Sequence, residues 1–118
     1  MSRINTNEQI KHYPPEYLAK RVLFEVYYSF LGFKVHELEP IRGIDWLQYT
    51  LALDQIDAPN SNEFAEFNEF VNKVFSENKE LRTLFATAVL CLKTAEVDKF
   101  NEIIEKLAEK LVELSPEQ

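Results

Sequence analysis

The stretch from Pro15 to Leu31 constrains the fold more than any other part of this sequence. Written as a helix, it places its polar residues on one narrow stripe and leaves nearly every other position apolar. Such a helix must be covered on most sides, so it lies either at the centre of a bundle or across an oligomer interface. The stripe consists of Glu16, Lys20, Glu25 and Ser29.

The ends of this helix follow from its flanking residues. Pro14 and Pro15 suit a first helical turn, and Gly32 predicts the C-terminal stop. The next segment, residues 33–40, fits either a continuation of the helix to Pro40 or a short extended segment. Both interpretations stay open at this point.

A second helix has a clear start signal. Asp45 is a good N-cap, and Gln48 three residues later completes a capping box. We expect this helix to run to about Ile56 and to end before Pro59, because the residue before a proline avoids the helical conformation.

Three further helices are predicted in the second half of the chain. The apolar stripes of the last two lose phase between Leu92 and Val97, a step of five residues, which predicts a break near Thr94 with Thr94 capping the next helix. The last helix repeats apolar residues in a heptad pattern, as coiled-coil seams do. The predicted ranges are 61–76, 79–93 and 95–114.

Length and composition limit the architecture. A chain of 118 residues has room for one domain, and only two glycines occur, which argues against a turn-rich β fold. The sequence therefore predicts an all-α protein, a single compact bundle of about five helices over residues 1–118, with residues 1–13 as a flexible arm. The apolar first helix and the heptad seam also predict a homodimer.

The net charge of −7 is unevenly distributed. Residues 1–50 carry six basic and six acidic side chains, whereas residues 51–118 carry seven basic and fourteen acidic ones. An acidic chain gains nothing from counterion release on DNA or RNA, so we expect no direct nucleic-acid binding. The acidic half serves solubility or, on a sharper interpretation, faces a partner with a basic surface.

The residues that usually carry chemistry are scarce. Two histidines, His12 and His36, and one cysteine, Cys91, cannot supply a structural zinc site, and no Glu-x-x-His motif points to a di-iron centre. A single cysteine fits the cytoplasm, and neither a membrane span nor a secretory signal is visible. We expect no cofactor, no metal, no membrane contact and no catalytic residue.

Short stretches are similar to segments of the small helical Rubisco assembly chaperones of cyanobacteria. They are a first helix with Tyr27, Tyr28 and Leu38, the pair Trp46–Leu47, and the stretch 77–81. Two positions at which that family carries arginine are Gly32 and Leu84 in this chain. With those two departures the similarity does not assign the chain to the family.

Aromatic residues crowd the first half of the chain, which holds nine of the fifteen. They build either the core or a surface that binds protein, where tyrosine and tryptophan are favoured. The resulting hypothesis is a protein-binding helical module, acting as a small adaptor, assembly factor or inhibitor. Its alternatives are an acidic mimic that occupies a basic nucleic-acid-binding surface and an enzyme with a pocket between helices. The candidate anchors are Tyr27, Tyr28, Phe30 and Phe33.

Overall fold

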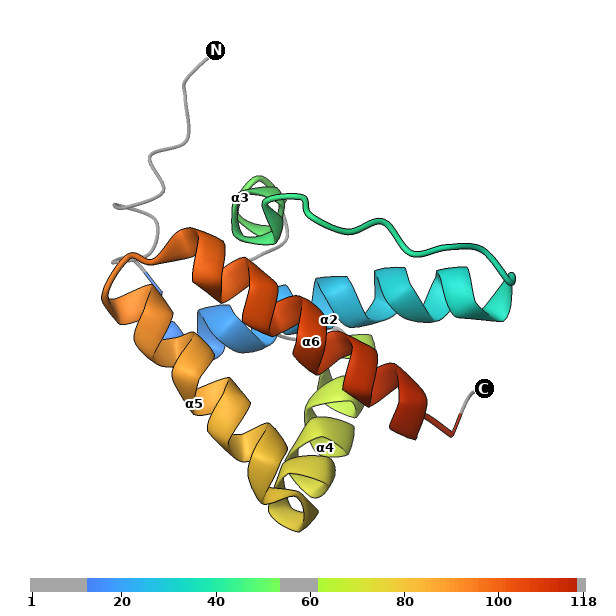
Figure 1. The fold of residues 1–118 in the computed structure, drawn as a ribbon. Helices are drawn as coiled ribbons and strands as arrows, with labels where there is room; N and C mark the ends of the chain where they lie inside the picture. The colour runs from blue at the N-terminus through green and yellow to red at the C-terminus, as the bar shows by residue number, and fades with distance from the viewer. Residues whose placement is uncertain (1–12, 54–61, 117–118) are drawn as a thin grey trace.

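The computed structural model of the chain describes residues 13–53 and 62–116. Over these residues it contains five helices and no strand, which confirms the predicted all-α bundle (Figure 1). The helices are α2 (Pro15–Val35), α3 (Trp46–Leu51), α4 (Asn62–Glu77), α5 (Lys79–Lys93) and α6 (Val97–Leu114). The predicted arm lies mostly outside the described residues.

Helix α2 is the centre of the bundle. It contacts α3, α4, α5 and α6, and Figure 1 shows α6 crossing over its middle. Its buried residues occupy most of its circumference, as the sequence pattern predicts, so much of its apolar surface is covered within one chain. They are Leu18, Ala19, Arg21, Val22, Leu23, Phe24, Val26, Tyr27, Phe30 and Leu31.

The prediction that Gly32 ends this helix is wrong. The helix continues through Gly32 to Val35, and the residue that takes the left-handed conformation is Glu37, with φ of 58°. The N–H groups of Glu37 and Leu38 donate to the carbonyl oxygens of Lys34 and Phe33, at 3.2 and 2.8 Å. These two bonds form a Schellman motif, which satisfies the last carbonyl groups of the helix without a glycine.

Helix α3 begins where the capping box predicts, and it ends earlier in the chain than the sequence predicts. The Asp45 carboxylate accepts the backbone N–H of Gln48 at 3.1 Å, which confirms the N-cap. The helix ends at Leu51 instead of Ile56, and Ala52 forms the C-cap.

The break between α5 and α6 is confirmed, and α5 has the predicted bounds. The role assigned to Thr94 is wrong, because Thr94 is the C-cap of α5 and Glu96 is the N-cap of α6. Ala95 takes the left-handed conformation with φ of 58°, and the N–H groups of Ala95 and Glu96 donate to Leu92 and Cys91. This second Schellman motif turns the chain sharply enough for α6 to pack on α5.

The heptad seam of α6 faces the interior of the bundle. Four of its residues are fully buried, while Val97 is half-buried and Leu114 is exposed. Helix α6 packs against both α2 and α5, so the seam is covered by helices of the same chain. The fully buried residues are Phe100, Ile104, Leu107 and Leu111.

Candidate functional site: an exposed face of helix α2

Two of the four predicted anchors lie in the core. Tyr27 and Phe30 are 4% and 3% exposed. The Tyr27 hydroxyl donates to the Ser115 hydroxyl at 3.0 Å, and the Phe30 ring lies 6.2 Å from that of Trp46. Both aromatic side chains therefore hold the bundle together and are not accessible to a partner in this conformation.

The other two anchors lie at the surface. Tyr28 is exposed at the edge of an aromatic cluster, with its ring 4.9 Å from Phe24 and 5.1 Å from Tyr27. Phe33 is partly exposed in the last turns of α2. The structure thus separates the predicted set into two core residues and two residues that a partner can reach.

Tyr28 belongs to a continuous exposed face of α2. Gly32 and Val35 follow it at the i+4 and i+7 positions, which lie on one side of a helix. Both are exposed, and Figure 1 shows this end of α2 projecting past the helices that cover its middle. We call Tyr28, Gly32 and Val35 the α2 face.

Several exposed apolar side chains belong to the second half of α2 and the connection that follows it. Among the described residues seven large apolar side chains are exposed, and four of them lie between positions 28 and 41. Single exposed apolar residues are common on protein surfaces, and only contiguous patches of them mark binding sites. The four are Tyr28, Val35, Leu38 and Ile41.

Gly32 is not required by the fold of one chain. A Cβ atom built at this position meets no atom within 4 Å, and the residue is helical, without a positive φ. Gly32 lies in the last turn of α2, and glycine inside a helix costs up to about 0.5–1 kcal/mol relative to alanine. The α2 face therefore contains a residue that weakens the helix and leaves its backbone open to close approach. Interpreting Gly32 as a helix stop hid this feature in the sequence.

An enzyme could use Cys91 or His36 as a reactive side chain, and the structure places the two in different settings. His36 is exposed at the C-cap of α2. Cys91 is 5% exposed, and burial raises the pKa of its thiol, an effect that the Glu96 carboxylate reinforces and Lys99 opposes. A raised pKa keeps the sulfur as an unreactive thiol.

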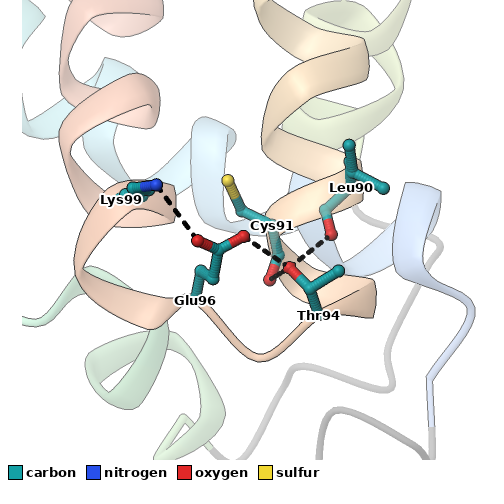
Figure 2. Close-up of polar contacts among 5 residues, drawn as sticks. All are labelled: Leu90, Cys91, Thr94, Glu96 and Lys99. Atoms are coloured by element: carbon teal, nitrogen blue, oxygen red, sulfur yellow. Dashed lines mark hydrogen bonds and ion pairs between the residues drawn. The ribbon is translucent and has the colours of Figure 1, made fainter.

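Polar groups near Cys91 close the turn between α5 and α6 (Figure 2). The Thr94 hydroxyl lies 2.8 Å from a Glu96 carboxylate oxygen, and the Lys99 ammonium lies 3.1 Å from the other oxygen. The hydrogen bond from Thr94 and the charge of Lys99 lower the pKa of Glu96. These contacts join the end of α5 to the first turn of α6.

Part of the acidic surplus also has an internal role. One Glu105 carboxylate oxygen accepts the backbone N–H of Gly43 at 2.8 Å and the indole N–H of Trp46 at 2.7 Å. Glu109 pairs with Arg42, whose guanidinium lies 4.7 Å from the Phe30 ring. Two carboxylates of α6 thus fasten the connection between α2 and α3 to the bundle.

No group of three or more histidine, cysteine, aspartate or glutamate side chains within the described residues could hold a metal ion. In the same residues, no helix is long and apolar enough to cross a membrane. The fold defines the chain as an all-α helical bundle. Comparison with protein-family models, curated proteins and solved structures found no match.

Proposed function

We propose that this protein is a protein-binding helical module, a small adaptor, assembly factor or inhibitor, that binds through the α2 face. We further propose that a second copy of the chain is one of its partners, so that the protein is a homodimer. The observation that carries the proposal is Gly32, which lies between two exposed apolar residues at a position where the fold leaves room for a side chain.

The chemistry of the face suits contact with another helix. Gly32 has no side chain, so a partner backbone can approach α2 closely at that point. Tyr28 and Val35 flank it with apolar area, and the Tyr28 hydroxyl offers a polar tip, a combination enriched at protein interfaces. Two α2 helices that cross at Gly32 would bury both flanks of each copy.

The alternatives rest on weaker observations. An acidic mimic would use the carboxylates of residues 51–118, of which Glu105 and Glu109 bind within the chain. An enzyme would need polar groups that converge on Cys91 or His36, and Cys91 is packed while His36 is exposed. Neither alternative explains why an exposed glycine stands between Tyr28 and Val35 on α2.

Light scattering coupled to size-exclusion chromatography tests the proposal with a matched pair of variants. Val35 is the last residue of α2 and Leu114 the last residue of α6, and they are 57% and 52% exposed. A lysine suits the last turn of either helix, so both variants should fold. We expect a dimer for the wild type and Leu114→Lys, and a monomer for Val35→Lys.

Two results would contradict the proposal. A wild-type chain that stays monomeric up to millimolar concentration would exclude the homodimer. A dimer that Leu114→Lys disrupts as strongly as Val35→Lys does would place the interface elsewhere. Circular dichroism of each variant confirms that the helices are retained.

A further inference from the structure

A hollow in the surface runs along α5. Six residues of this helix occupy one face at the spacings i, i+3, i+4, i+7, i+8 and i+11 and line an open groove of about 570 Å³. They are Arg82, Phe85, Ala86, Val89, Leu90 and Lys93. We call this hollow the α5 groove, and α2 and α4 form its other wall.

The groove has an apolar floor. The rings of Phe75 from α4 and Phe85 from α5 lie 5.3 Å apart, and Val89 continues the surface along α5. Leu90 is 57% exposed at the edge of the groove, although it stands in the interior of a helix whose exposed positions are otherwise polar or small. An apolar floor with an exposed leucine at its rim is suited to receive apolar side chains.

Basic side chains surround the apolar floor of the groove. Arg82 stands at one end of the α5 stripe and Lys93 at the other, and Lys20 reaches in from α2. Glu16 is the one carboxylate among the groove residues, so the groove is cationic in a protein whose net charge is −7. A local charge opposite in sign to that of the molecule selects an acidic partner and sets its orientation.

Lys20 is held in place by the groove itself. Its ammonium donates to the Asn72 side chain at 3.1 Å and lies 5.9 Å from the centre of the Phe85 ring. Burial lowers the pKa of Lys20, and the nearby Glu16 opposes that effect. A carboxylate from a partner would restore the electrostatic stabilisation that burial removes from this ammonium group.

We propose that the α5 groove binds an amphipathic helix of another protein, with apolar side chains facing the floor and carboxylates at both ends. The span from Arg82 to Lys93 is roughly 16 Å, which matches three helical turns. Helices that dock in grooves present apolar anchors at i, i+3 or i+4, and i+7. The groove therefore accepts a helix with two or three such anchors and acidic residues near each end.

The test uses a display library of three- to four-turn helical peptides in which every position varies. The wild-type protein is the target, and Leu90→Gln, which keeps the charge and removes the apolar rim, is the counter-target. We expect selected peptides to be enriched in leucine or phenylalanine at i, i+3 or i+4, and i+7, with aspartate or glutamate at both ends. Enrichment of basic peptides, or no enrichment, would overturn the proposal.

Fluorescence anisotropy of the selected peptide then locates the site with two charge-matched variants. Lys93 lies in the groove, and Lys110 is exposed on α6 outside it. We expect Lys93→Glu to weaken binding about fivefold, the effect of one exposed charge pair, and Lys110→Glu to weaken it much less. Equal weakening by the two variants would show attraction to overall charge and would contradict a site in the groove.

This proposal and the proposed function can fail separately. Leu90 and Val35 lie on different helices, so Leu90→Gln should leave the dimer intact and Val35→Lys should leave peptide binding intact. Loss of peptide binding in Val35→Lys would show that the peptide occupies the α2 face, and the groove would then have no partner of this kind.

Discussion

The indole N–H of Trp46 donates to the carboxylate of Glu105 at 2.7 Å, which joins α3 to α6 across 59 positions of sequence. The same carboxylate oxygen accepts the backbone N–H of Gly43. Trp46 is 3% exposed, so its N–H has no access to bulk water as a substitute partner. Glu105 therefore fixes the position of α3 on the bundle.

Replacing Glu105 by alanine should destabilise the protein by about 2 kcal/mol, because two donors lose a charged acceptor. Glu109→Ala is the matched control on the same helix, since it removes an exposed pair with Arg42 and should cost about 0.5 kcal/mol. Urea unfolding followed by Trp46 fluorescence measures both. Equal losses in the two variants would contradict the role given to Glu105.

Ala95→Gly should stabilise the protein by about 1 kcal/mol. Ala95 has φ of 58°, a conformation that costs an L-residue roughly this much and that glycine adopts freely. Ala86→Gly is the control, because Ala86 is exposed in the middle of α5, and there the same change should destabilise by a similar amount. Thermal unfolding of the two variants should give shifts in opposite directions.

Cys91 should react with a thiol reagent only when the bundle opens. The side chain is buried and its pKa is raised, so the native protein exposes little thiolate. Because the native state keeps the proton that the unfolded thiol releases, stability should fall as the pH rises through the range in which an unfolded thiol ionises. Labelling in the native state as fast as in denaturant would contradict this burial.

Glu96→Gln should lower the melting temperature at neutral pH and have a smaller effect in acid. The pKa of Glu96 is lowered by the Thr94 hydroxyl and by Lys99, so its ionised form stabilises the native state. This contribution is present above the pKa of about 4.5 that the unfolded carboxyl has and is lost as the pH falls through the lower native value. A difference that does not change with pH would contradict the contact.

The sequence predicts those parts of the fold that depend on neighbouring residues. The Asp45 cap, the central position of α2 and the break near Thr94 all follow from local spacing or from apolar periodicity. The end of α2 did not, because Glu37 adopts a conformation for which glycine is the usual choice. Sequence patterns report how strongly each residue type prefers a backbone conformation. Tertiary packing overrides a conformational preference of about 1 kcal/mol.

The candidate sites could be predicted only in part. Aromatic crowding pointed to α2, but it could not separate Tyr27 from Tyr28, since their exposure depends on where α4 and α6 lie. The α5 groove combines residues of three helices, and Lys20 meets Asn72 across 52 positions of sequence. Contacts at such separations leave no local pattern to detect.

Gly32→Ala tests the central claim most directly, because stability and self-association should change in opposite directions. The added methyl group meets nothing within the chain, so the folded protein should gain about 0.5–1 kcal/mol of stability. The same group should separate the two copies at the point of closest approach. Sedimentation equilibrium should therefore give a dimer dissociation constant raised about tenfold or more, the effect of roughly 1.4 kcal/mol. A variant that is more stable and dimerises as tightly as the wild type would contradict the account.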